Sequence, residues 1–180
     1  MKHLTFDRNE HIYTSTAFAE LVKDAVRFFN GTPVHTLPPP EAFGGTGVYA
    51  IYYTGQHPAY KKYAELNRLA YNFPIYVGKA VPKGWRQARL SDDVLFEGEA
   101  SDMIGTIEAA LIKLNMPLWN TVVDGFGNHD PGKGRYEQAK SDWDVIHPGR
   151  AWAEKCKGTH SGAVAIVARV DAHLNQLGSQ

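Results

Sequence analysis

Two short segments rich in β-branched and aromatic residues constrain this fold more than any other feature of the chain. Residues 47–53 have the sequence GVYAIYY and residues 74–78 the sequence PIYVG. Such residues favour strands because they pack well on a pleated, half-buried surface. Each segment also places a glycine beside an aliphatic–tyrosine pair, and glycine lets another group approach the backbone. We therefore expect two buried strands, with room for a substrate close to the sheet.

Apolar residues at helical spacing predict helices around these strands. The expected helices run from a cap at Ser15 or Thr16 to residues 30–31, over residues 58–70, from a cap at Ser101 over residues 102–115, and over residues 161–177. A proline-rich arm follows the first helix, because proline disfavours helix at its own position and the preceding one. Further expectations are a short third strand at residues 94–96, mostly loop over residues 124–150, and a strand over residues 163–170 as the alternative to the last helix.

The composition fits one folded domain. With 180 residues, 43% of them hydrophobic, the chain can bury roughly 70% of its unfolded surface. Its 19 Lys and Arg residues balance 19 Asp and Glu residues. This balance argues against a protein that binds nucleic acid over its whole surface. The single cysteine, Cys156, excludes an internal disulfide and a multi-cysteine zinc site, and no run of 18 apolar residues occurs. We expect a cytoplasmic protein with no membrane partner.

Glu108 interrupts the apolar face of the helix expected over residues 102–115. It lies four residues after Ile104 and four before Ile112, so its carboxylate should face the domain interior or the edge of a cleft. A buried carboxylate without a partner is costly, so a positive group should meet it. Two interpretations stay open, a structural ion pair with Arg or Lys and a ligand for a hard cation such as Mg²⁺.

Taken in order, these features resemble the GIY-YIG nuclease superfamily. The resemblance rests on four features in this order: Gly47-Val48-Tyr49, Tyr76-Val77-Gly78, a helix presenting Glu108, and Asn120. The match is closest to the type II restriction endonucleases that cut the palindrome CCGCGG. The resemblance implies a small α/β (α+β) domain with a mainly antiparallel central sheet flanked by helices. Within a single domain of residues 1–180, the nuclease core would span residues 44–120, preceded by the helix and arm of residues 1–43. DNA-contacting loops and C-terminal helices would follow in residues 121–180.

The same resemblance implies roles for individual residues. Glu108 would bind a single divalent metal, Mg²⁺ or its substitute Mn²⁺, that holds the scissile phosphate. Tyr49 would activate water, directly or with a neighbouring base, and Tyr76 would orient the phosphate or assist Tyr49. Asn120 would hydrogen-bond active-site groups, although the sequence by itself also fits a turn residue after Pro117.

Two departures from the family pattern stand out. The half-motifs are separated by 26 residues, more than a short hairpin, which an inserted helix over residues 58–70 would explain. The family also places an arginine on a helix after the second motif, and here only Arg86 and Arg89 are candidates. Only five residues separate Leu90 from Phe96, too few for a helix and a connecting loop. We expect residues near 88–94 to be absent from this chain, together with the family's arginine and histidine.

The charge distribution fits double-stranded DNA as a partner. No acidic residue occurs from Leu66 to Ser91, and this stretch can neutralise several phosphates. The predicted DNA contacts are Lys79, Lys83, Lys133, Arg135 and Arg150. Lys79 is also a candidate to replace the family's arginine as the positively charged group near Tyr76.

The sequence therefore predicts a Mg²⁺-dependent, site-specific endonuclease. A palindromic GC-rich target would call for a homodimer, with one active site for each strand. Two alternatives remain: a DNA-binding module that has lost cleavage, and a protein-interaction domain whose Glu108 pairs with an arginine.

Overall fold

The computed structural model describes residues 13–38, 45–80, 92–132 and 134–177, with residues 92–102 described as helical backbone only. The chain divides into two compact units, Met1–Pro39 and Pro40–Gln180. The division falls close to the predicted start of the nuclease core at residue 44. A single domain across both units stays a prediction.

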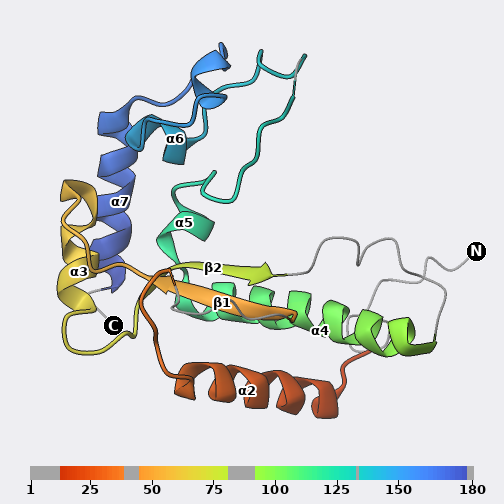
Figure 1. Ribbon diagram of the computed structural model, residues 1–180. Coiled ribbons are helices and arrows are strands. Elements are labelled where there is room, and N and C mark those ends of the chain that lie inside the picture. Colours follow the sequence, from red (N-terminus) through yellow and green to blue (C-terminus); the bar gives the residue numbers. More distant parts are fainter. Residues whose placement is uncertain (1–12, 39–44, 81–91, 133, 178–180) are drawn as a thin grey trace, which may run out of the picture. The chain divides into compact units, whose positions relative to one another are not determined.

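The first unit contains the helix α2 (Thr16–Gly31), shown in red in Figure 1. Ser15 caps it, because its Oγ accepts a hydrogen bond from the Phe18 amide at 3.2 Å. The predicted helix, its cap and its end are confirmed.

The second unit is built on a two-stranded antiparallel sheet of β1 (Gly47–Tyr52) and β2 (Pro74–Ala80). The register places Tyr49 opposite Gly78 and Ile51 opposite Tyr76. Both predicted strands and their antiparallel pairing are confirmed. Helices flank the sheet, as Figure 1 shows for α4 and α5 in green.

The long connection between the strands folds as a 3₁₀ turn, η1 (Pro58–Tyr60), and a short helix, α3 (Lys61–Leu66). The helix expected over residues 58–70 is thus confirmed in shortened form. Asn67 ends it and returns the chain to the sheet: its side chain is buried, donates to the Phe73 carbonyl at 2.9 Å and accepts from the Phe73 amide at 3.1 Å. The insertion is therefore an ordered part of the domain.

The third strand predicted at residues 94–96 is wrong. These residues belong to α4 (Asp92–Asn115), which begins ten residues before the predicted start at residue 102. A short apolar run does not distinguish a strand from a buried helical segment, and no proline interrupts this stretch. Good helix formers such as Glu97, Glu99 and Ala100 continue the helix through it.

The core lies between the sheet, η1 with α3, and the terminal helix α7 (Ala163–Leu177), which confirms the predicted last helix and not its strand alternative. The remaining elements are α5 (Leu118–Thr121), α6 (Asp142–Ile146) and a 3₁₀ turn, η2 (Ala153–Lys155). The fully buried side chains include Tyr60, Tyr63, Ile75, Leu118, Ile166 and Val170. No helix in the described part of the chain is long and apolar enough to cross a membrane; the cytoplasmic location stays a prediction.

Replacing Tyr63 by Phe should reduce the loss of stability at alkaline pH. Burial raises the pKa of Tyr63 to about 12, whereas an unfolded tyrosine ionises near its ordinary value of about 10. The buried phenol therefore stabilises the fold fully below about pH 10, and this contribution is lost as pH rises toward 12. Urea unfolding of Tyr63→Phe should give a shallower decline above pH 10 than the wild type. Tyr13→Phe, at a 91% exposed position, is the control; equal declines in all three proteins would contradict the argument.

Candidate active site

Tyr49 and Tyr76 come together over the two-stranded sheet. Their ring centroids lie 6.0 Å apart, and Tyr49 is 41% exposed to solvent. Gly78 makes this packing possible, since a Cβ there would lie 2.7 Å from Tyr76 Cε1 and 2.8 Å from the Tyr49 hydroxyl. The expected close approach to a motif glycine is thus made by the tyrosines themselves.

Tyr76 lies in surroundings that favour its protonated form. The pKa of Tyr76 is raised first by burial, then by electrostatic interaction with its neighbours Tyr49 and Glu108, and by a hydrogen bond with Tyr49. A phenol that keeps its proton is a hydrogen-bond donor. Tyr76 is therefore suited to donate to an anionic oxygen.

Glu108 points from α4 toward β2 and meets Lys79, a cation from the sheet. Lys79 Nζ lies 3.1 Å from Glu108 Oε2, with side-chain exposures of 42% and 19%. The positive partner that the sequence required is therefore Lys79. Because Lys79 is well exposed, the ion pair lies at the rim of the domain and a ligand can reach it.

Among the described residues, Glu108 is the carboxylate whose charge acts on Tyr76, which makes it the candidate metal ligand. Within the described ranges, no group of three or more His, Cys, Asp or Glu residues is placed to hold a metal ion. A hard cation bound to Glu108 would therefore need water and substrate oxygens as its other ligands, which Mg²⁺ commonly uses. The donor set fits such an ion, and the Lys79 ammonium already occupies a cation position beside the carboxylate.

Asn120 lies in α5 and binds the backbone of β2. Its Oδ1 accepts from the Val77 amide and its Nδ2 donates to the Val77 carbonyl, both at 2.8 Å. The side chain thereby fixes the residue between Tyr76 and Gly78. The predicted catalytic role of Asn120 stays a prediction; its place in the structure is at the strand that carries the second motif.

An aromatic contact to Tyr76 was missed in the sequence. The Phe126 ring packs edge-on against Tyr76 at 4.7 Å between centroids and stacks on Trp119 at 4.6 Å. A Cβ on the neighbouring Gly127 would lie 3.2 Å from the Tyr76 hydroxyl. The only hint in the sequence is that glycines stand on either side of Phe126. Loop residues follow no periodic pattern, so the sequence could not predict that Phe126 faces the sheet.

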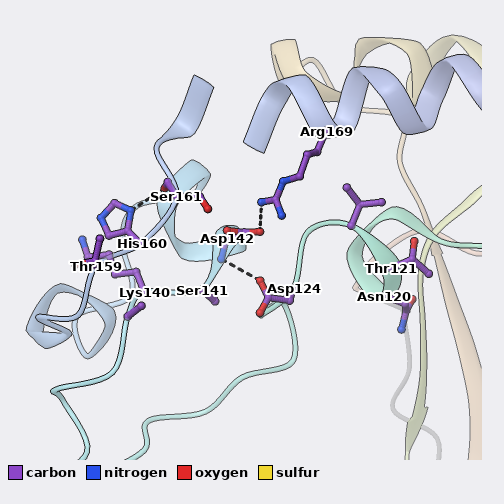
Figure 2. A pocket seen from close by; sticks show the side chains of 12 residues that line it. Asn120, Thr121, Asp124, Lys140, Ser141, Asp142, Thr159, His160, Ser161 and Arg169 are labelled. Carbon is purple, nitrogen blue, oxygen red and sulfur yellow. Dashed lines mark hydrogen bonds and ion pairs between the residues drawn. The ribbon is translucent and has the colours of Figure 1, made fainter. Parts of the chain in front are cut away.

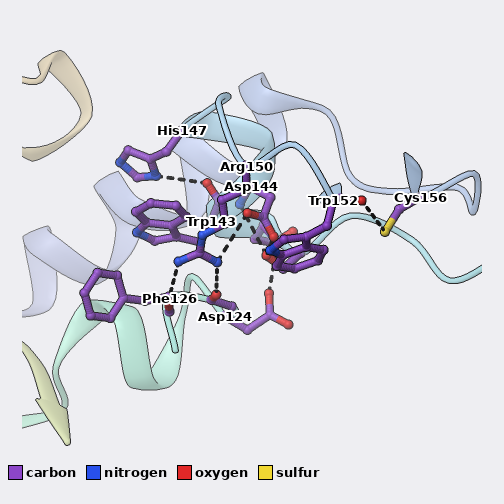
Figure 3. A network of polar contacts seen from close by, with 11 residues as sticks. Asp124, Phe126, Trp143, Asp144, His147, Arg150, Trp152 and Cys156 are labelled. Atoms are coloured by element: carbon purple, nitrogen blue, oxygen red, sulfur yellow. Dashed lines mark hydrogen bonds and ion pairs between the residues drawn. The ribbon is translucent and has the colours of Figure 1, made fainter. Parts of the chain in front are cut away.

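Of the predicted DNA-binding and arginine residues, the structure describes Lys79, Arg135 and Arg150. Arg86, Arg89, Lys83 and Lys133 lie outside the described residues. Arg135 is exposed in the loop before α6. Arg150, by contrast, is directed inward, where its guanidinium binds backbone carbonyls and the buried Asp144 (Figure 3). DNA contacts by these residues stay predictions.

An open polar pocket of about 450 Å³ adjoins Asn120. Figure 2 shows that its side chains come from α5 and the loop after it, from the start of α6 and the residues before it, and from α7 and the segment before it. Several of its polar groups pair with one another: Arg169 with Asp142, and the Asp142 amide with Asp124 Oδ1 at 3.2 Å. Internal pairing of this kind satisfies the pocket's charges without a ligand.

Comparison with known proteins supports the resemblance found in the sequence. A family model described as the Eco29kI GIY-YIG domain matches residues 41–100 and residues 94–174. The two matches cover well over half of the chain and overlap at residues 94–100, in the first part of α4. No curated protein matches the chain.

Substituting Gly78 by Ala should displace both tyrosines while leaving the fold intact. Its Cβ would overlap the Tyr76 ring and the Tyr49 hydroxyl, so these side chains must move. The matched control is Gly47→Ala in β1, where a Cβ meets no atom of the described residues within 4 Å. In NMR spectra of tyrosine-labelled protein, Gly78→Ala should shift the signals of Tyr49 and Tyr76, and Gly47→Ala should not. Unchanged tyrosine signals in Gly78→Ala would contradict the packing described here.

Proposed function

The chain belongs to the family of Eco29kI GIY-YIG nuclease domains, and on this premise we propose that it is a metal-dependent type II restriction endonuclease. Membership of this family indicates, at the general level, a DNA endonuclease. The observation that carries the finer proposal is the convergence of Tyr49, Tyr76 and Glu108 beside one two-stranded sheet. Phosphodiester hydrolysis needs an oriented water, a donor to the phosphate and a site for positive charge, and these three residues can supply them.

Glu108 is the residue that would hold the metal, Mg²⁺ or its substitute Mn²⁺. When bound, such an ion supplies a Lewis acid that polarises a phosphoryl oxygen. Lys79 lies beside the same carboxylate and can neutralise it when no metal is bound. A phosphate that approaches Glu108 therefore also meets the Lys79 ammonium.

Tyr49 is exposed and the pKa of Tyr76 is raised by burial, which supports different roles for the two tyrosines. In hydrolysis, the water oxygen bonds to phosphorus as the bond from phosphorus to the leaving sugar oxygen breaks, and the water proton passes to a base. Tyr49 is accessible to that water, as its 41% exposure shows. Tyr76 keeps its proton because burial raises its pKa, so we assign it as the donor to a phosphate oxygen.

The target proposed for this chain is a palindromic, GC-rich site such as CCGCGG, the sequence cut by the restriction enzymes it resembles. Two-fold symmetric DNA is matched by a two-fold symmetric homodimer, which would place one set of Tyr49, Tyr76 and Glu108 at each strand.

A second candidate is a DNA-binding module that keeps the fold without cleaving. The short connection after the second motif favours it, because only five residues separate Leu90 from Phe96 where the family has a helix with an arginine. Arg86 and Arg89 are the proposed replacements for that arginine. Binding of the same DNA without cleavage would identify the module.

Glu108→Gln should abolish cleavage without unfolding the protein. The amide keeps the side-chain shape but loses the charge that attracts a divalent ion, and we expect a loss of about 10² to 10³ in single-turnover cleavage rate. Tyr49→Phe should lose a similar factor, about 10² to 10⁴ if its hydroxyl takes part in proton transfer. Mn²⁺ binding, followed by electron paramagnetic resonance, should weaken in Glu108→Gln and persist in Tyr49→Phe.

The control for this experiment is Glu65→Gln, on the exposed side of α3, where the carboxylate forms only a surface ion pair with Lys61. It should cleave as the wild type does. Full activity in Glu108→Gln would rule out the metal assignment, and equal losses in both glutamine variants would indicate a general effect of charge.

A further inference from the structure

An arginine from a distant part of the chain binds two successive carbonyls of the loop that contacts Tyr76. Arg150 Nη1 donates to the Gly125 carbonyl at 2.8 Å, and Nη2 donates to the Phe126 carbonyl at 2.5 Å (Figure 3). The donors of a guanidinium form a rigid planar fork, so two adjacent carbonyls bound in this way have little freedom. Arg150 therefore restrains the backbone at Phe126, beside the packing of the Phe126 ring on Trp119 and Trp143.

The guanidinium is itself held in place from two sides. Arg150 Nη1 lies 3.3 Å from Oδ1 of Asp144, whose side chain is 1% exposed, and Ser141 Oγ donates to the other carboxylate oxygen at 2.6 Å. The Trp143 ring lies 4.1 Å from the guanidinium carbon. A carboxylate this deeply buried requires a charged partner, so the Arg150 guanidinium stays beside Asp144 inside the domain.

The anchored loop reaches the tyrosine site through Phe126. Its ring packs edge-on against Tyr76, and Gly127 leaves the space next to the Tyr76 hydroxyl free of a side chain. Tyr76 is in turn packed against Tyr49. A continuous series of contacts thus runs from Asp144 through Arg150 and Phe126 to the two tyrosines.

We propose that Arg150 is a positioning residue for the cleavage reaction, whose guanidinium holds residues 125–127 so that Phe126 fixes the Tyr76 ring beside Tyr49. The kinetic part of this inference rests on the proposed nuclease function, whereas the link between Arg150 and Tyr76 can be measured without any activity. The proposal differs from a phosphate contact by Arg150 in its consequence. A positioning residue changes the rate of the chemical step, while a phosphate contact changes DNA affinity and its dependence on salt.

Arg150→Lys tests the proposal, because it keeps a positive charge near Asp144 but replaces the rigid planar fork with a single ammonium, which cannot hold both carbonyls in the same geometry. A small displacement of a catalytic group commonly costs about 10² in rate, so we expect single-turnover cleavage to fall about 10- to 100-fold. The affinity for DNA and its salt dependence should be unchanged. The ring protons of Tyr76 should lose the ring-current shift that Phe126 imposes, as seen by NMR of tyrosine-labelled protein. The control is Arg169→Lys, which alters another Arg–Asp pair of the same unit and should leave rate and spectra unchanged.

Phe126→Leu provides a second, independent measurement if Arg150→Lys does not fold. It should move the Tyr76 signals and lower the cleavage rate in the same way, and the double variant should lose little more than the larger single loss, because both changes act through one contact. Weakened DNA binding with a reduced salt dependence and unchanged Tyr76 signals would overturn the proposal, as would unchanged Tyr76 signals in Phe126→Leu. A wild-type protein that does not cleave DNA would refute the proposed function, and the tyrosine spectra would still decide the positioning role.

Discussion

The pair of hydrogen bonds between Asn120 and Val77 is the interaction on which the site depends. An antiparallel sheet of only two strands is marginal by itself, and its edges carry backbone groups that need partners. Asn120 satisfies both polar groups of Val77 with bonds of 2.8 Å, in place of a neighbouring strand. The residues on either side of Val77 are Tyr76 and Gly78, so the same two bonds hold the second motif in its register with Tyr49.

This interaction also determines where the acidic group lies. The helix α4, which carries Glu108, ends at Asn115, and α5 begins three residues later at Leu118. Asn120 therefore attaches the segment that follows α4 to β2, the strand that also supplies Lys79. The aromatic loop around Phe126 continues from α5 and covers Tyr76. One short segment after α4 thus brings the acid, the lysine and the tyrosines together.

The parts of this arrangement that local sequence patterns encode could be predicted. The two strands, the capped helix at Ser15 and the inward position of Glu108 follow from residue type and spacing, and the family resemblance supplied the order ending at Asn120. The start of α4 was mispredicted, because a short apolar run at residues 94–96 is compatible with either a strand or a helix. The partners of Glu108 and Arg150 were beyond prediction, since Lys79 and the loop carbonyls are brought to them only by tertiary packing. Arg150 was interpreted from its charge alone, and the structure gives that charge a buried partner in Asp144.

The central claim is that one compact arrangement of Tyr49, Tyr76 and Glu108 cleaves DNA. The most direct test is to digest DNA of known sequence, containing CCGCGG sites, with the purified 180-residue chain in Mg²⁺ and in EDTA, and to map the ends of the products. We expect discrete fragments in Mg²⁺ only, with all ends at one two-fold symmetric sequence. DNA bound but uncut in Mg²⁺, or cut equally well in EDTA, would contradict it.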